Sequence, residues 1–266
     1  MAEFTAKDVQ ALRQATGAGM MDAKKALTET GGDMGAARKL LRERGLAKAD
    51  DRAGRENAQG AVAIATGEGT VGMVELKCET DFVAKSEEFV GLTQALAEAV
   101  AAQGESGVAT HQRAVDDLKV TLKENIEVGG VVQVKLAGGE TVDTYLHRQE
   151  GRGVNGVVVV LQGGSQELAH DIAVHVAFAK PQYLTRDEVP DEVVAEERQT
   201  LLDITRAEGK PEAAWPKIVE GRLNGWYKER VLLDQPYVRD DKVTVGQLAE
   251  GAGATIVRFA QLFIGG

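Results

Sequence analysis

The hydrophobic and polar positions of residues 1–45 follow a helical period in three short segments. Thr5 and Asp33 each stand just before such a segment, where a side chain can cap a helix N-terminus. Gly17 follows the first segment and Gly45 follows the third, and glycine is the residue that most often ends a helix. The pattern therefore predicts a small three-helix domain that stops at Gly45.

Residues 46–59 are highly charged with few apolar residues. After them, a strand period followed by a helix period occurs twice. Short strands followed by one helix, in two copies, predict an α+β fold with two similar antiparallel-sheet subdomains. Two amphipathic helical stripes on either side of a break at 208–211 predict an inserted antiparallel helical hairpin. The predicted segments are a three-helix N-terminal domain 1–45, a linker 46–59, core subdomains 60–129 and 130–186, a helical hairpin (coiled coil) 187–232, and a return to the core 233–266.

The stretch 74–85, VELKCETDFVAK, begins with strand alternation and loses it at Thr80. Ser86 then stands at the N-cap position of a helix. Phe82 and Val83 are therefore predicted to lie in the turn between a strand and a helix. Apolar residues in a turn either fold back onto the core or belong to a surface that binds a partner. From the pattern alone, packing of Phe82 beneath the following helix is the simpler interpretation.

Composition describes a globular protein, with 43% hydrophobic and 27% charged residues among 266. The net charge of −10 disfavours binding to nucleic acid or to anionic membranes. No apolar run is long enough to span a bilayer, and MAEFTAKDVQ resembles neither a signal nor a transit sequence. Cys78 is the only cysteine, which excludes an intrachain disulfide and fits a reducing cytoplasm.

Three patterns suggest chemistry, and each also has a structural explanation. Two Gly-x-Gly-x-x-Gly matches run into strands rather than helices, so they are interpreted as hairpin glycines: 67, 69, 72 and 151, 153, 156. A nicotinamide-dependent oxidoreductase is the alternative that these matches leave open. His170 and His175 are five residues apart, which does not suit a metal pair on one helix face. Cys78 is interpreted as a buried structural thiol, with a Cys/His nucleophilic pair as the alternative.

The segments TGAGMMDAKKAL (16–27) and TDFVA (80–84) closely resemble those of the bacterial elongation factor Ts family. That family consists of guanine nucleotide exchange factors for elongation factor Tu, which are not enzymes with catalytic residues of their own. The resemblance implies a ubiquitin-associated-like N-terminal bundle and a first core subdomain that both face the partner's nucleotide-binding domain. It implies binding to GDP-bound and nucleotide-free elongation factor Tu, allows a homodimer within a 2:2 complex, and requires no cofactor, metal or direct nucleotide binding. A protein-binding scaffold without exchange activity is the alternative function.

The resemblance also implies which residues contact the partner. It assigns disturbance of the partner's Mg²⁺ and phosphate site to Thr80, Asp81, Phe82 and Val83. It assigns N-terminal contacts to Met20, Met21 and Lys24. Adjacent residues do not share a helical face, so one methionine can pack inward while the other stays free; the alternative places both in the bundle core. His147 resembles a partner-contacting histidine, although residues 148–150 depart from the family's pattern.

Overall fold

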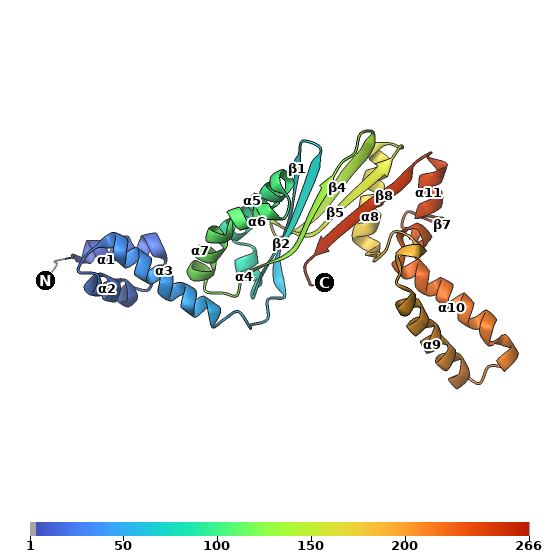
Figure 1. The fold of residues 1–266 in the computed structure, drawn as a ribbon, viewed down its shortest axis with the longest axis horizontal. Helices are drawn as coiled ribbons and strands as arrows, with labels where there is room; N and C mark the ends of the chain where they lie inside the picture. The colour runs from blue at the N-terminus through green and yellow to red at the C-terminus, as the bar shows by residue number, and fades with distance from the viewer. Residues whose placement is uncertain (1–3, 266) are drawn as a thin grey trace. The chain divides into compact units, whose positions relative to one another are not determined.

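The computed structural model describes residues 4–265, apart from the side chains of Lys48 and Asp50. Residues 1–3 and 266, which the predicted end segments include, lie outside the described residues. The fold is mixed, with helices and small sheets, as the α+β prediction required. The chain divides into two compact units (Figure 1): the first contains residues 1–135, 148–155 and 262–266, and the second contains residues 136–147 and 156–261.

The first unit begins with three helices, α1 (Ala6–Thr16), α2 (Met20–Glu29) and α3 (Met34–Asp50). Thr5 caps α1 in a capping box with Asp8, and Gly17 ends that helix with φ 65°. Asp33 caps α3 through hydrogen bonds to two backbone N–H groups. The small core of this helical part consists mainly of leucine and alanine side chains: Val9, Leu12, Ala23, Ala26, Leu27, Ala37 and Leu41.

The prediction that the third helix stops at Gly45 is wrong, because α3 continues to Asp50 and takes in part of the predicted linker. A Cβ at Gly45 would lie 2.5 Å from Cγ1 of Val120, on α7 (Gln112–Leu122). Arg42, one turn earlier, forms an ion pair with Asp117 of the same helix at 2.9 Å. Gly45 therefore serves close packing between two helices, which local sequence patterns do not distinguish from a helix stop.

Gly45→Ala is expected to destabilise the protein by about 1–3 kcal/mol, because the new methyl group overlaps Val120 although alanine favours the helix itself. Urea unfolding of the full chain measures the change. The matched control is the same substitution in a Val120→Ala background, where most of the loss should disappear. An equal loss in both backgrounds would contradict this explanation.

The first sheet has the order β1–β2–β3, from β1 (Gln59–Gly67), β2 (Thr70–Cys78) and β3 (Glu127–Lys135), with both pairings antiparallel. Helix α5 (Glu87–Gln103) packs across β1 and β2 (Figure 1). The short helices α4 (Asp81–Ala84) and α6 (Ser106–Thr110) lie before and after α5 in the chain. The core beneath α5 contains residues such as Leu76, Phe89 and Leu96, all fully buried.

The strand expected to open the second subdomain belongs to the first sheet. Val131 of β3 pairs with Val74 of β2, so a boundary at 129/130 divides a sheet, and the first unit extends to Lys135. The sequence pattern predicted a strand here but carries no information about which strand it pairs with, because pairing depends on tertiary packing.

The glycine matches lie in and beside hairpins, as interpreted. Gly67 ends β1, Gly69 lies in the turn between β1 and β2, and Gly151 lies in the turn before β5 (Arg152–Gln162). Gly72 has a different reason: a Cβ there would lie 2.3 Å from the backbone nitrogen of Ala101 in α5. Only glycine lets the helix approach β2 this closely.

The second unit contains a sheet of order β4–β5–β8, with β4 (Glu140–Gln149), β5 and β8 (Thr255–Phe263), and helix α8 (Gln166–Ala179). Tertiary contacts bring the fully buried Val157 and Ile172 of this unit into one core cluster. The remaining small elements are β6 (Pro236–Tyr237), β7 (Asp240–Thr244), α11 (Val245–Gly251) and the 3₁₀ turns η1 (Arg186–Glu188), η2 (Glu212–Ala214) and η3 (Leu232–Asp234).

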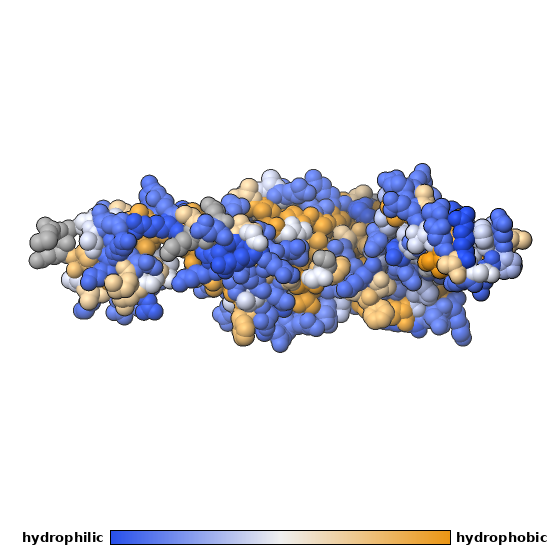
Figure 2. Space-filling view, turned by 90° about the horizontal axis from the view of Figure 1, so that it is seen from below, coloured by the Kyte–Doolittle hydropathy of each residue, from blue (hydrophilic) through white to orange (hydrophobic). Residues whose placement is uncertain are grey.

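Helices α9 (Asp191–Ala207) and α10 (Trp215–Arg230) lie side by side as a hairpin (Figure 1). Pro216 stands in the first turn of α10, where its missing N–H leaves no helix hydrogen bond unmade. On the face shown in Figure 2 hydrophobic residues gather over the sheets, while the hairpin is mostly hydrophilic. Among residues 4–265, every helix is too short or too polar to traverse the hydrocarbon layer of a membrane.

Candidate partner-binding site

The TDFV segment forms a one-turn helix, α4, at the end of β2. Thr80 caps it, since the Thr80 Oγ1 accepts a hydrogen bond from the Val83 N–H at 3.3 Å and its carbonyl accepts one from the Ala84 N–H at 3.2 Å. The sequence predicted a turn here, and the capping threonine closes that turn into helical geometry. Side chains on so short a helix point to different sides of it.

The two apolar residues of the turn have opposite environments. Val83 is half-buried and packs against the core of the first unit, whereas the Phe82 side chain is 80% exposed. The interpretation that Phe82 packs beneath the next helix is therefore wrong, and the fully buried Phe89 of α5 belongs to that core instead. A phenylalanine side chain this exposed is a feature of binding surfaces.

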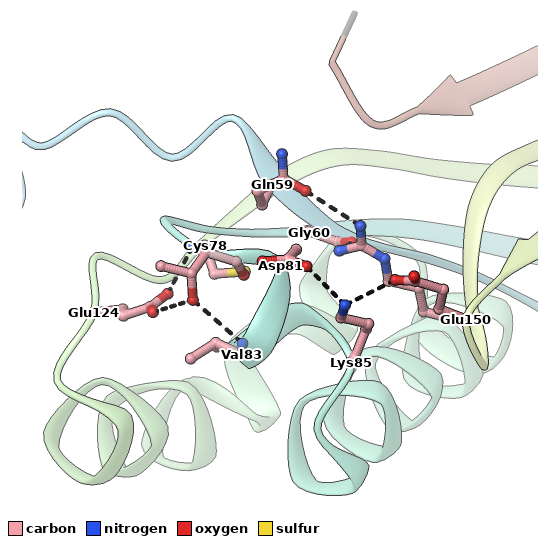
Figure 3. Close-up of polar contacts among 10 residues, drawn as sticks. Gln59, Gly60, Cys78, Asp81, Val83, Lys85, Glu124 and Glu150 are labelled. Atoms are coloured by element: carbon pink, nitrogen blue, oxygen red, sulfur yellow. Dashed lines mark hydrogen bonds and ion pairs between the residues drawn. The ribbon is translucent and has the colours of Figure 1, made fainter.

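Glu124 anchors the N-terminal end of α4 (Figure 3). Its Oε2 accepts hydrogen bonds from the backbone N–H groups of Glu79 and Thr80 at 3.0 and 3.1 Å, and its Oε1 accepts one from the Thr80 hydroxyl at 2.5 Å. Such charge-assisted bonds are stronger than those between neutral groups. They fix the backbone from which Phe82 projects.

The anchor is reciprocal. The Glu79 carboxylate accepts a hydrogen bond from the backbone N–H of Asn125 at 2.7 Å, and the Asn125 amide donates to the carbonyl of Arg55 at 2.8 Å. Asn125 is only 4% exposed. The side chains of Glu124 and Glu79 thus join the segment after α7 to the end of β2 by hydrogen bonds in both directions.

Lys85 lies at the other end of α4, between two carboxylates. Its Nζ is 2.7 Å from Asp81 Oδ2 and 2.8 Å from Glu150 Oε2 (Figure 3). The hydrogen bond from Lys85 lowers the pKa of Asp81, and the hydrogen bonds to Asp81 and Glu150 raise the pKa of Lys85. Both groups are therefore charged at neutral pH. The ammonium also lies 5.6 Å from the centre of the Phe82 ring, within the range of a cation–π contact.

Cys78 lies directly beneath this helix and is fully buried, as predicted for a structural thiol. Its Sγ donates a hydrogen bond to the Thr80 carbonyl at 3.3 Å. Burial raises the pKa of the thiol to about 12. The thiolate that a nucleophile requires is therefore scarcely populated at neutral pH.

Met20, Met21 and Lys24 all lie on the exposed side of α2. Met20 is 48% and Met21 74% exposed, so the alternative that places both methionines in the bundle core is wrong, as is the inward position for either. The reason is the small face that α2 buries, which is supplied by alanine and leucine at Ala23, Ala26 and Leu27.

His147 lies on β4 and is exposed. Its ring is stacked on that of Tyr145, with ring centres 6.5 Å apart and planes inclined by 21°. It belongs to the second unit, whereas Phe82 and Met21 belong to the first. Within that unit, the structure gives His147 an accessible aromatic setting.

Comparison with known proteins identifies the family. A family model described as Elongation factor TS matches residues 79–266. Proteins named Elongation factor Ts from Micrococcus luteus and Renibacterium salmoninarum are 43% and 44% identical over 280 and 277 residues, and each alignment covers 100% of both chains. The chain belongs to the elongation factor Ts family. It is therefore an elongation factor of protein biosynthesis.

Membership of the elongation factor Ts family accounts for both motifs that carried the resemblance, because the full-length relatives span the N-terminal segment as well as α4. Sequence reasoning did not find the residues that hold α4 in place, namely Glu124, Lys85 and Glu150. Nothing local in the sequence indicated that Glu124 would reach back to Thr80. Lys85 and Glu150 carried no comparable signal.

Proposed function

We propose that this protein is a guanine nucleotide exchange factor for elongation factor Tu and acts in the cytoplasm. It binds the GDP-bound partner, disturbs the partner's Mg²⁺ and phosphate site through α4, and leaves a nucleotide-free complex that GTP can reload. The protein contributes binding free energy and holds no nucleotide itself. One observation carries the proposal: Phe82 is 80% exposed on a short helix whose N-cap residue, Thr80, is held by Glu124.

The physical argument is thermodynamic linkage. If this protein weakens nucleotide binding by the partner, nucleotide must weaken binding of this protein by the same factor. Burial of a phenylalanine contributes about 2–3 kcal/mol, and about 1.4 kcal/mol corresponds to a tenfold change in affinity. Inserting Phe82 beside the metal site can therefore offset the cost of moving a partner helix. Asp81, ionised and held by Lys85, adds negative charge near the phosphates.

The direct test mixes the full chain with elongation factor Tu loaded with fluorescently labelled GDP and follows release by stopped flow. With unlabelled GDP in large excess, a substoichiometric amount of this protein should release all of the labelled nucleotide, because the unlabelled nucleotide displaces the factor and lets it act again. Binding without acceleration would contradict the proposal and favour a scaffold.

Met21→Ala is expected to weaken binding to elongation factor Tu by roughly tenfold, since it removes an exposed side chain from the surface proposed to dock on the nucleotide-binding domain. Because the side chain is 74% exposed, stability should change by less than about 0.5 kcal/mol. Titration calorimetry with nucleotide-free partner measures the affinity. Leu27→Ala, which alters the buried face of the same helix, separates loss of folding from loss of contact; unchanged affinity in the folded Met21→Ala protein would remove α2 from the proposed interface.

A further inference from the structure

Resting on the proposed function, we infer that Lys85 is a positioning residue for Phe82 and that Glu150, in the turn between β4 and β5, holds Lys85 in place. Neither residue needs to touch the partner for this role. The two of them would fix the C-terminal end of α4, as Glu124 fixes its N-terminal end. The inference concerns how the exposed ring is held before the partner arrives.

Lys85 is well placed for this role. Its ammonium bridges Asp81 and Glu150 at 2.7 and 2.8 Å, and its side chain is only 27% exposed. The backbone N–H of Lys85 also donates to the Asp81 carbonyl at 3.1 Å, closing the helical turn. Asp81 and Phe82 are consecutive, so restraint of the Asp81 side chain restrains the direction in which Phe82 projects. The contact of the ammonium with the Phe82 ring adds a second restraint.

Glu150 occupies a backbone conformation that does not suit glutamate. Its φ is 50°, and the φ of Gly151 is 85°. Two successive residues with positive φ are typical of a tight two-residue hairpin turn, in which asparagine or glycine is favoured at the first position. Glutamate is unfavourable in this backbone conformation. The ion pair between its carboxylate and Lys85 offsets that cost.

The turn that carries Glu150 is itself fastened to the first sheet. Arg152, only 7% exposed, donates to the carbonyl of Gly60 at 2.8 Å and to Oε1 of Gln59 at 3.2 Å. These bonds connect the residue after the turn to β1. The turn that carries Glu150 is therefore held to the sheet by hydrogen bonds, and the ion pair with Lys85 connects α4 to this turn.

Lys85→Met is expected to lower the maximal rate of nucleotide release about three- to tenfold, which corresponds to the loss of one or two partly exposed ion pairs. The concentration of factor that gives half-maximal rate should change by less than about twofold, because the rest of the interface is intact. Lys85→Arg, which keeps the charge, should restore most of the rate.

Glu150→Asn is the sharper variant, because asparagine suits the turn and only the carboxylate is lost. It should lower the release rate in the same direction as Lys85→Met, and the double variant should be no slower than Lys85→Met alone. The matched control is Glu68→Asn in the Glu68-Gly69 turn of the β1–β2 hairpin. No ion pair involves Glu68 among the described residues, and its φ is not positive. This control should leave the rate unchanged.

Amide hydrogen exchange of the free full-length protein tests whether Lys85 and Glu150 hold α4 in place, independently of nucleotide release. The N–H groups of Ala84 and Lys85, which close α4, should exchange faster in Lys85→Met and Glu150→Asn than in the wild type, and not in Glu68→Asn. Unchanged protection in both variants would overturn the inference. So would unchanged release rates in both, provided that Phe82→Ala slows release. If Phe82→Ala has no effect, the proposed role of α4 in nucleotide release fails, and hydrogen exchange still decides whether Lys85 and Glu150 position α4.

Discussion

Phe82→Ala is expected to reduce the acceleration of GDP release from elongation factor Tu by roughly 30- to 150-fold, with binding still measurable. The factor follows from loss of about 2–3 kcal/mol of burial that the side chain gains only in the complex. Stability should change by less than about 0.5 kcal/mol, because the ring is 80% exposed in the free protein. Stopped-flow release and urea unfolding measure the two quantities.

Phe178→Ala is the matched control, because that phenylalanine is 77% exposed on α8 of the second unit. If an exposed aromatic ring contributed only nonspecific hydrophobic contacts, Phe82→Ala and Phe178→Ala would reduce the release rate equally. Wild-type release rates with Phe82→Ala would remove α4 from the mechanism, whatever other part of the surface binds the partner.

Glu124→Ala is expected to have the next largest effect, and it acts on both folding and exchange. The carboxylate accepts three hydrogen bonds from Glu79 and Thr80, so its removal should cost about 2–3 kcal/mol of unfolding free energy. Release should slow by at least about tenfold in the folded variant, since the backbone that presents Phe82 loses its restraint. Release is measured well below the unfolding midpoint, so that only folded protein is compared.

Two variants separate these effects. Glu124→Gln keeps the shape and one acceptor oxygen, so it should lie between wild type and Glu124→Ala in both measurements. Glu127→Ala removes a nearby carboxylate that bonds to the Asn57 amide at 3.0 Å rather than to α4. It should therefore spare the release rate. A Glu124→Ala protein that releases nucleotide as fast as the wild type would show that α4 needs no anchor.

The local elements were predictable because their signals are local. Thr5, Asp33 and Ser86 cap helices at the predicted positions, and their side chains accept hydrogen bonds from the first helical turn. The glycines of the hairpins were likewise readable, because positive φ is a property of a single residue. Gly45 misled the prediction, since the same residue type also permits close helix contact, and only α7 distinguishes the two uses.

The exposed face of α2 also shows that a local pattern does not decide which side chains are buried. The helical period allowed either methionine to face inward, and the choice depended on how small the gap between α1, α2 and α3 is. Alanine at positions 23 and 26 fills that gap, which leaves both methionines outside. The two methionines of the motif that carried the family resemblance are thus surface residues, whereas its Leu27 belongs to the core.

By itself, the sequence determined the helices and strands, the turn after β2, and the two motifs that mark the elongation factor Ts family. Only the tertiary structure decided that β3 joins the first sheet, that Phe82 projects while Val83 packs, and that Glu124 and Glu150 hold the two ends of α4. The physical reason is the distance along the chain over which each interaction acts. Caps and periods act over one or two turns of chain, whereas strand pairing and charge-assisted anchors join residues that become neighbours only when the core packs.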